Sequence, residues 1–318
     1  MSDRKKIAVV LFSIGGPLKK ADIKPYLFNF FFDKNIINAP LIIRYLLAKY
    51  ISIKRSKNEA LESYAHLNFK SPLLENTKKQ AEALELELKN NKDAEYKCFV
   101  AMRYWHPFCY ETVKEIEKYN PDKVILLPFY PQYSFATSYS SIEDFYKKFK
   151  NKKIVTEIKN YPENDGFISA SVKNIQEQIN KLENQKYRIL FSAHGLPEEN
   201  IKAGDPYKQQ CELTMNAIVK KLNIDNLDYN ICFQSKVGSK EWIKPYIQDE
   251  LKRAANDKIG VIIYPIAFVS EHVETLVELD IEYKELAKKL GVPFYKRVKT
   301  VGDSKKFIEG LKNLVISK

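Results

Sequence analysis

Histidine is scarce in this chain, and two of its four histidines follow apolar runs typical of buried strands. His194 ends the segment Phe191-Ser192-Ala193-His194, and Gly195-Leu196-Pro197 comes next. We expect the strand to stop there, because glycine lets the chain turn where other residues cannot. An imidazole at a strand end can act as a base or a metal ligand near neutral pH. The alternative is a histidine that is simply hydrogen-bonded within a turn.

The second of these histidines, His272, begins a segment rich in carboxylates. Three glutamates follow it at intervals of four residues, so on a helix they line one face. They are Glu274, Glu278 and Glu282. Ser270 is the predicted N-cap, and acidic residues in the first turn suit the positive end of a helix. Two interpretations stay open: a solvated acidic stripe, or a row that leads protons or a cation towards the first histidine.

Aromatic and small polar residues follow the apolar runs in the first half of the chain. They lie in the segments 12–17, 102–108 and 127–134. Ligands of open α/β sheets bind at the carboxyl ends of the strands, so these segments predict a cleft for a large, flat, apolar ligand with a few polar anchors. The pair Gly15-Gly16 could instead cradle a phosphate. No G-x-G-x-x-G or Walker pattern is present, which disfavours nucleotide binding.

These segments need a scaffold, and eight short β-branched runs alternating with helical segments provide one. The expected strands are 6–13, 96–102, 123–130, 153–158, 188–192, 229–234, 259–265 and 292–295. The expected helices are 71–89, 112–119, 166–184, 211–222, 241–256, 281–290 and 304–314. Continuous apolar runs are typical of strands buried on both faces of a parallel sheet.

A turn at 161–166 divides the eight strands into four and four. We therefore expect an α/β fold with two similar doubly wound domains, each with a mainly four-stranded parallel sheet, facing across a cleft. The expected bounds are 1–160 for an N-terminal domain, 161–303 for a C-terminal domain that carries the histidine and the glutamates, and 304–318 for a terminal helix.

Composition excludes several classes of protein. The chain has 318 residues, of which 45% are hydrophobic and 29% charged, so it can form a core and is not disordered. The first residues carry no small-residue cleavage site, and no run predicts a membrane span. The four cysteines are scattered, without a C-x-x-C pair, which favours a reducing cytoplasm over a disulfide framework or a zinc site.

The net charge of +12 leaves nucleic acid, an anionic membrane surface or an acidic small molecule as partners. No Arg-rich block or nucleic-acid motif is present, so nucleic-acid binding is disfavoured. Segment 41–57 is apolar with interleaved basic residues. It fits an ordinary amphipathic helix packed on the core, which is the more common case. It also fits a surface helix that rests on an anionic bilayer, and hence peripheral contact with the cytoplasmic face of a membrane.

Several long motifs, in one order along nearly the whole chain, resemble the ferrochelatase family. They are MRYWHPF at 102–108, LPFYPQYS at 127–134, FSAHGLP at 191–197, GDPY at 204–207, CFQSKVGSKEW at 232–242 and SEHVETLVELDIEY at 270–283. The resemblance implies an enzyme that inserts ferrous iron into protoporphyrin IX, the terminal step of haem synthesis, and it agrees with the two-domain fold expected above.

The resemblance also implies roles for individual residues. His194 matches the histidine that faces the porphyrin centre as metal ligand, proton acceptor or both. Glu274 matches the glutamate paired with it, as a second metal ligand, and Glu278 matches the next acid along the helix. Fe²⁺ is then a substrate, and no permanent cofactor is expected. The chain ends without the cysteine-bearing extension of some relatives, so no iron–sulfur cluster is expected either.

The remaining matches concern the porphyrin. Arg103 and Tyr104 match a pair that lines the pocket opposite the histidine, and Ile14 matches a position against the face of the macrocycle. Tyr64 and Ser71 match positions near the propionate end. Tyr133 and Ser134 fall within the matching segment 127–134 and are expected to bind porphyrin. Arg55, in the basic pair before Tyr64, is expected to bind it as well.

The sequence departs from the family pattern at three places. A Gly-rich turn is replaced by Asn68-Phe69-Lys70, a glycine is replaced by Tyr139, and the basic pair Lys54-Arg55 is one residue out of register. The alternatives that stay open are a coproporphyrin III ferrochelatase and a non-catalytic porphyrin or haem carrier. A cobalt chelatase is a more distant one.

Overall fold

The computed structural model describes residues 4–183, 185–238 and 240–318, which form two compact units. Unit 1 comprises residues up to 130, 134–160 and 311–318; unit 2 comprises 131–133 and 161–310. The chain therefore passes from one unit to the other after residues 130, 133, 160 and 310. Each unit holds one four-stranded sheet in which all strands are parallel, so the predicted α/β fold is confirmed.

The sheet of unit 1 has the order β2-β1-β3-β4. Its strands are β1 (Lys5–Ser13), β2 (Ala94–Met102), β3 (Lys123–Pro128) and β4 (Val155–Glu157). Val10 of β1 pairs with Phe99 of β2 and with Leu126 of β3. All but the first two residues of β1 are buried, because helices cover both faces of the sheet. Parallel pairing brings the carboxyl ends of β1, β2 and β3 to one edge, where the predicted porphyrin residues begin.

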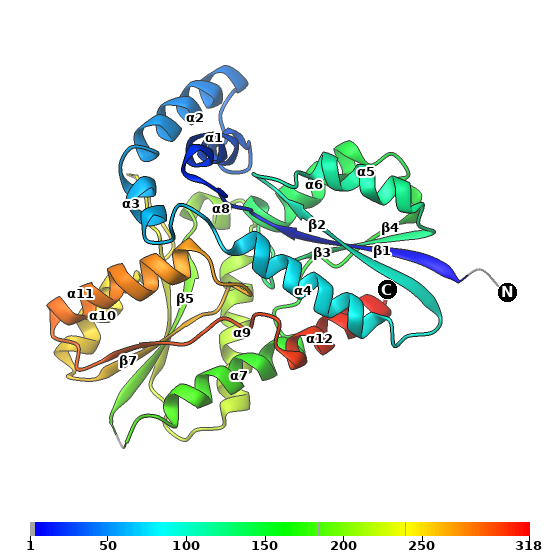
Figure 1. Cartoon of the computed structure of the whole chain (residues 1–318). Coiled ribbons are helices and arrows are strands. Elements are labelled where there is room, and N and C mark those ends of the chain that lie inside the picture. The colour runs from blue at the N-terminus through cyan, green and yellow to red at the C-terminus, as the bar shows by residue number, and fades with distance from the viewer. Residues whose placement is uncertain (1–3, 184, 239) are drawn as a thin grey trace. The chain divides into compact units, whose positions relative to one another are not determined.

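Helices surround this sheet, with α5 and α6 on one face and α4 on the other (Figure 1). The helices of unit 1 are η1 (Lys20–Asp22), α1 (Ile23–Phe32), α2 (Leu41–Arg55), α3 (Glu59–Ala65), α4 (Leu73–Leu88), α5 (Cys109–Tyr119), η2 (Phe135–Tyr139), α6 (Ser140–Lys148) and η3 (Lys152–Ile154). The core between sheet, α5 and α6 is aromatic: the rings of Phe12 and Phe145 meet edge to face at 6.0 Å.

Unit 2 repeats this plan, with the strand order β6-β5-β7-β8. Its strands are β5 (Tyr187–His194), β6 (Tyr229–Gln234), β7 (Gly260–Pro265) and β8 (Tyr295–Arg297). Its helices are α7 (Asp165–Ile179), α8 (Glu198–Lys202), α9 (Tyr207–Leu222), α10 (Ile247–Asn256), the π-helix η4 (Glu274–Glu282) and α11 (Tyr283–Leu290). Helices α7 and α9 pack together, as do α10 and α11 (Figure 1). The last helix, α12 (Lys305–Ile316), contains the final passage between units.

Several predicted elements of unit 2 have different bounds; the helix expected over 211–222, for example, begins at Tyr207. The helix expected over 241–256 begins only at Ile247, because the preceding residues bond to the loop after β5: Ile243 N–H donates to Leu196 O at 2.9 Å. The strand expected over 292–295 is instead Tyr295–Arg297. The helix expected over 166–184 ends at Ile179, and its predicted end, Asn184, lies outside the described residues.

The prediction of Ser270 as an N-cap is wrong. The helix begins after His272, so the capping position lies two residues beyond Ser270; the His272 N–H donates to the side-chain oxygen of Thr275 at 3.0 Å. The segment that follows is a π-helix, in which hydrogen bonds span five residues rather than four. Such segments occur frequently at functional sites.

The environment of α2 also differs from the more common case expected for it. Only Ala48 and Ser52 of its fifteen residues are buried. Most of its large apolar side chains are exposed, with Ile42 at 75% and Leu46 at 59%. The helix is therefore not an ordinary core helix with its apolar face covered. Among the described residues, no helix is both long enough and apolar enough to cross a bilayer.

Candidate functional site

His194 is the last residue of the central strand of unit 2. Its Nδ1 lies 2.6 Å from the carbonyl oxygen of Gly195. A carbonyl can only accept, so in the neutral ring Nδ1 carries the proton and Nε2 keeps its lone pair. Other residues pack closely against the backbone at Gly195: a Cβ there would lie 3.0 Å from Gln234 O and from the Trp242 ring. The predicted turn thus presents a basic ring nitrogen at the strand end.

The π-helix brings Glu274 to this nitrogen. Glu274 Oε2 lies 4.0 Å from His194 Nε2, and its Oε1 lies 3.8 Å from His272 Nε2. His272 is buried, at 3% exposed, and its Nδ1 has no hydrogen-bond partner among the described residues. One carboxylate therefore stands between two imidazoles. Sequence reasoning singled out His272 but did not place it in the site; its position two residues before Glu274 was the signal.

Glu278 lies further along the same helix and is held by the end of β6. Gln234 Nε2 donates to its Oε2 at 2.8 Å, and the Ser235 N–H donates to its Oε1 at 2.9 Å. Burial and the neighbouring Glu274 carboxylate raise the pKa of Glu278 above its usual 4.5. The residue can therefore take up a proton more readily than an exposed carboxylate, which suits a group that passes protons.

We expect the free energy of unfolding of Glu278→Gln, minus that of the wild type, to increase with pH in metal-free buffer. Glu278 ionises near pH 4.5 in the unfolded chain and at a higher pH in the folded one. The wild type therefore loses stability as the pH rises from about 4.5 through the raised pKa. Glutamine does not ionise and escapes this loss. Urea denaturation at about pH 5 and about pH 8 measures the difference. A difference that shrinks with pH contradicts the argument; exposed Glu285→Gln is the control.

An ion-pair cluster fixes both ends of the segment that carries these glutamates. Arg297 on β8 donates to Glu271 at 2.8 Å, just before the π-helix, and to Asp280 at 2.6 Å, near its end. Burial alone would raise the pKa of Glu271, but Arg297 and hydrogen bonds from Thr275 and Thr300 bring it below its usual value. Removal of one partner from such a buried cluster is costly, so the π-helix is held firmly in place.

In unit 1, three of the predicted porphyrin residues lie together at the carboxyl ends of β1 and β2. The Tyr104 N–H donates to Ile14 O at 3.0 Å, and the Arg103 N–H donates to Ser13 O at 2.8 Å. Tyr104 is fully buried, which raises the pKa of its hydroxyl far above the usual value. Ile14 is half-buried and Arg103 keeps 19% of its side chain exposed. The pair following β2 is therefore fixed through its backbone to the end of β1.

Tyr64 and Ser71 form a second group with the glycine pair after β1. A Cβ on Gly16 would lie 2.6 Å from Ser71 Oγ and 3.8 Å from the Tyr64 hydroxyl, so only glycine fits between them. Both side chains are buried. Arg55, at the end of α2, lies 3.3 Å from Glu59 Oε2 and over the ring of Phe31.

Tyr133 and Ser134 follow β3 but belong to different units. The Tyr133 N–H donates to Gln210 Oε1 of unit 2 at 2.7 Å. Ser134 is buried and caps η2: its hydroxyl accepts from the Ala136 N–H at 3.2 Å. These contacts give Ser134 a structural task in addition to the binding role expected of it.

Two departures from the family pattern have clear local consequences. Asn68 and Phe69 adopt φ of 52° and 60°, the left-handed region that glycine enters without strain. The chain therefore keeps a glycine-type turn without glycine. Tyr139 has φ of −61°, an ordinary helical value, so no glycine is needed at that position.

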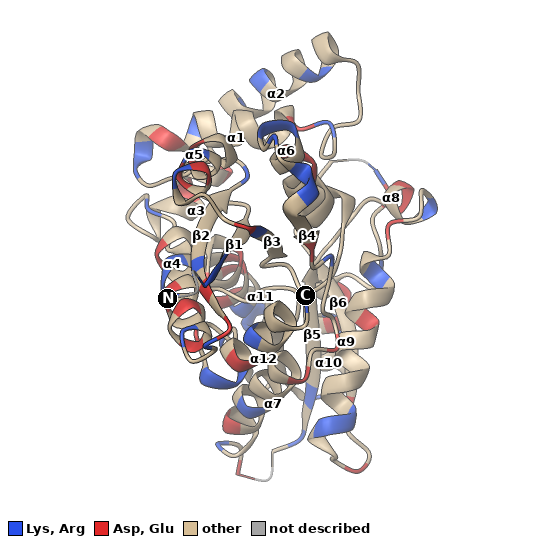
Figure 2. Ribbon diagram, turned by 90° about the vertical axis from the view of Figure 1, so that its right-hand side faces the viewer, with Lys and Arg blue, Asp and Glu red and all other residues tan. Residues whose placement is uncertain are grey.

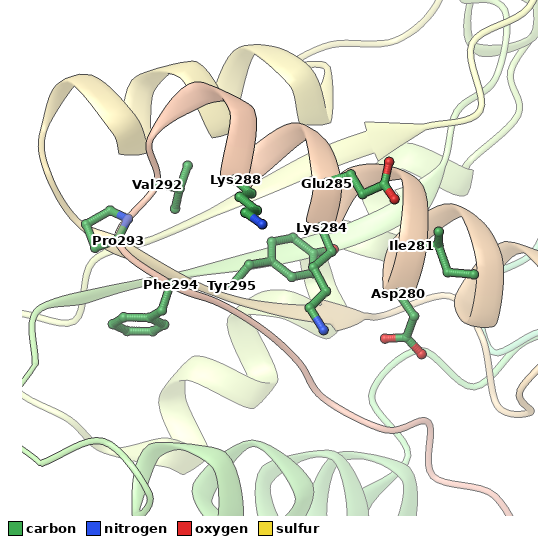
Figure 3. Close-up of a pocket in the computed structure, with 9 residues that line it drawn as sticks. All are labelled: Asp280, Ile281, Lys284, Glu285, Lys288, Val292, Pro293, Phe294 and Tyr295. Atoms are coloured by element: carbon green, nitrogen blue, oxygen red, sulfur yellow. The ribbon is translucent and has the colours of Figure 1, made fainter.

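A depression on unit 2 lies apart from these residues. It has a volume of about 460 Å³ and lies between α11 and the segment leading into β8, beside Lys284, Lys288 and Tyr295 (Figure 3). None of the predicted site residues lines it. Among the described residues, no three His, Cys, Asp or Glu side chains converge closely enough to hold a metal ion on their own.

Solved structures with a similar fold include the sirohydrochlorin chelatase SirB and the enzyme CbiX. SirB from Bacillus subtilis with Fe³⁺ matches with a TM-score of 0.57 and 11% identity, over 98% of this chain and 95% of that one. CbiX, the terminal enzyme for biosynthesis of siroheme in denitrifying bacteria, matches with a TM-score of 0.52 and 10% identity, over 99% of both chains. The two parallel sheets therefore define a protein of the chelatase fold class.

The ferrochelatase family model matches residues 6–318. Ferrochelatase of Rickettsia felis is 47% identical over 313 residues, 98% of this chain and 90% of the relative. Ferrochelatase of Wolbachia sp. subsp. Drosophila simulans (strain wRi) is 47% identical over 317 residues, 98% and 99% of the two chains. The chain belongs to the ferrochelatase family. It is an enzyme, a metal chelatase of the lyase class, and the family's reaction inserts ferrous iron into a porphyrin for haem synthesis.

Proposed function

We propose that this chain inserts Fe²⁺ into protoporphyrin IX to give protohaem, with His194 as proton acceptor and metal ligand beside Glu274. The observation that supports this most directly is the lone pair on His194 Nε2, 4.0 Å from a carboxylate oxygen and fixed by the bond from Nδ1 to Gly195 O. Imidazole and carboxylate are both suitable ligands for Fe²⁺.

The reaction exchanges two protons for one metal ion. Two pyrrole N–H bonds break, the lone pairs of all four ring nitrogens form Fe–N bonds, and two protons leave. His194 Nε2 accepts a pyrrole proton and passes it to Glu274, whose Oε2 lies 4.0 Å away. Glu278, with its raised pKa, and exposed Glu282 continue the path to solvent. The acidic row is thus proposed as a proton path.

The porphyrin resists insertion while flat, because its nitrogen lone pairs point inward. A rigid site that binds a puckered macrocycle better than a flat one lowers the barrier. Ile14, Arg103 and Tyr104 are proposed to contact the macrocycle. Tyr64, Ser71 and Arg55 are proposed near its propionates, and Tyr133 and Ser134 complete the proposed set. The buried and hydrogen-bonded state of Tyr104 supports the required rigidity.

Fe²⁺ is proposed as a substrate, and no resident cofactor or iron–sulfur cluster belongs to the proposal. A cluster needs several thiolates close together. The four cysteines lie on β2, α5, α9 and β6, two in each unit. Burial raises the pKa of the Cys109 thiol to about 12, which disfavours the thiolate that a metal would need.

The test is an anaerobic absorbance assay of the purified chain with Fe²⁺, and with Zn²⁺ as a proxy, on protoporphyrin IX beside coproporphyrin III. Faster insertion into protoporphyrin IX supports the proposal. Faster insertion into coproporphyrin III changes the substrate and keeps the mechanism. Tight porphyrin or haem binding without insertion overturns the enzyme mechanism in favour of a carrier.

We also propose that the chain works in the cytoplasm and that α2 rests on the anionic membrane surface. Its exposed apolar side chains are accompanied by four basic residues and no acidic one (Figure 2). Such a helix gains from apolar burial and from attraction to anionic lipid. At the membrane surface the enzyme would have access to a substrate that partitions into the bilayer.

We expect Ile42→Ser/Leu46→Ser to lower binding to anionic liposomes by about tenfold or more, since each side chain contributes about 1–2 kcal/mol on burial. Co-sedimentation across a salt series measures it. Leu86→Ser is the matched control, because Leu86 is 67% exposed but lies on α4. Binding that is indifferent to anionic lipid and salt contradicts this part of the proposal.

A further inference from the structure

A buried aspartate holds the two residues that follow β2. Asp33 comes directly after α1 and is 6% exposed. Its Oδ2 accepts a hydrogen bond from Arg103 Nη2 at 2.8 Å and another from the Tyr104 hydroxyl at 3.0 Å. One carboxylate oxygen therefore sets the orientation of two neighbouring side chains that differ in charge and shape.

Ser140 closes the arrangement from α6. Its hydroxyl donates to Asp33 Oδ2 and accepts from Arg103 Nε at 2.7 Å. The guanidinium is thus held at two of its nitrogens, Nε by the Ser140 hydroxyl and Nη2 by the Asp33 carboxylate. Its Nη1 makes no hydrogen bond to any residue in the described ranges and keeps its donors for a ligand.

The second oxygen of Asp33 is also occupied. Oδ1 accepts from the Asn35 N–H at 2.9 Å and from Asn35 Nδ2 at 3.1 Å. Burial alone would raise the pKa of Asp33, but Arg103 and these hydrogen bonds bring it below the usual 3.8, so the carboxylate stays ionised. With both oxygens engaged, Asp33 acts through its neighbours.

Residues at the end of α1 also contact the backbone and the ring of Tyr104. Asn29 Nδ2 donates to the Tyr104 carbonyl oxygen at 3.1 Å, and the ring of Phe30 meets the tyrosine ring edge to face at 5.0 Å. Backbone, ring and hydroxyl of Tyr104 are therefore all held from one helix end. Asp33 is the member of this set that also reaches Arg103.

We infer that Asp33 is a positioning residue for porphyrin binding: it holds the Arg103 fork and the Tyr104 ring in the orientation that meets the macrocycle. This inference rests on the proposed function. Asparagine cannot replace it, because an amide has a single acceptor oxygen and its NH₂ group would face the donors of Asn35. The expected defect is in binding, since neither oxygen of Asp33 is free to move protons.

Asp33→Asn tests the inference, with Asp22→Asn as the matched control. Asp22 is 9% exposed at the other end of the same helix, where it accepts from the Leu18 N–H at 3.2 Å. We expect Asp33→Asn to raise the KM and the Kd for protoporphyrin IX by about tenfold, with kcat within about threefold of wild type. The control should leave all three within about threefold.

A double-mutant cycle separates positioning from general loss of structure. If Asp33 acts through Arg103, the combined loss in Asp33→Asn/Arg103→Met is smaller than the product of the two single losses. Fully multiplicative losses, or an equal defect in Asp22→Asn, overturn the inference. Unchanged KM and Kd in Asp33→Asn overturn it as well.

Ser140→Ala covers the case in which Asp33→Asn does not fold, because it keeps the ion pair and removes only the bridging hydroxyl. A rise of about threefold in KM then supports the inference, and an unchanged KM overturns it. Failure of the proposed function looks different: a wild-type chain that binds no porphyrin overturns both. If the wild type binds porphyrin but Asp33→Asn binds it equally tightly, only the positioning role is overturned.

Discussion

Replacement of His194 by alanine is expected to abolish metal insertion, with a fall in kcat of at least about a hundredfold, or about 2.7 kcal/mol of barrier. The variant loses the imidazole at the strand end, whose Nε2 lies 4.0 Å from Glu274 Oε2. It also loses one of the two proposed iron ligands. Anaerobic absorbance assays of Fe²⁺ or Zn²⁺ insertion into protoporphyrin IX measure the effect.

The fold and porphyrin binding should survive this change. The His194 side chain is 36% exposed, and its one hydrogen bond is to the neighbouring residue, so little packing is lost. Porphyrin affinity and the thermal midpoint should therefore stay near wild type. His106→Ala is the matched control, because His106 is exposed and its hydrogen-bond partner among the described residues is Glu111. Unchanged turnover in His194→Ala would contradict the proposed mechanism.

Hydrophobic pattern was sufficient to predict the two sheets, for a physical reason. Strands such as β1 are buried on both faces, and their apolar runs admit few other structures. Boundaries set by distant contacts were not predictable in this way. Helix α10 starts late because Ile243 bonds to Leu196, nearly fifty residues away along the chain. The exposure of α2 was not predictable either, because it depends on which other elements pack against the helix, and amino-acid composition does not contain that information.

The candidate site was predictable where family motifs name the chemistry, even for a pair as distant along the chain as His194 and Glu274. His194, Glu274 and Glu278 lie near one another, although they come from β5 and a π-helix that periodicity does not distinguish from an α-helix. Asp33 was missed, since it lies in none of the motifs that resemble the family and only the fold brings it to Arg103. A lone acid at the end of the apolar run IKPYLFNFFF was the available signal.

Glu274→Gln is expected to slow metal insertion by at least about tenfold, roughly 1.4 kcal/mol of barrier. The amide keeps the size of the side chain and removes the negative charge beside His194 Nε2 and His272 Nε2. Both the stabilisation of a protonated imidazole and the affinity for Fe²⁺ then fall. Steady-state insertion rates over a range of Fe²⁺ concentrations measure the two contributions separately.

The three glutamates together distinguish a proton path from a solvated stripe. In a path, the loss should decline with distance from His194, so that Glu274→Gln costs most, Glu278→Gln less and Glu282→Gln least. In a stripe, all three should match the exposed control Glu285→Gln, because water screens each charge alike. The described geometry favours a graded series: only Glu274 faces both imidazoles, and Glu278 is tied to β6 by Gln234 and Ser235. A flat series returns the row to its stripe interpretation and leaves His194 as the sole proton acceptor.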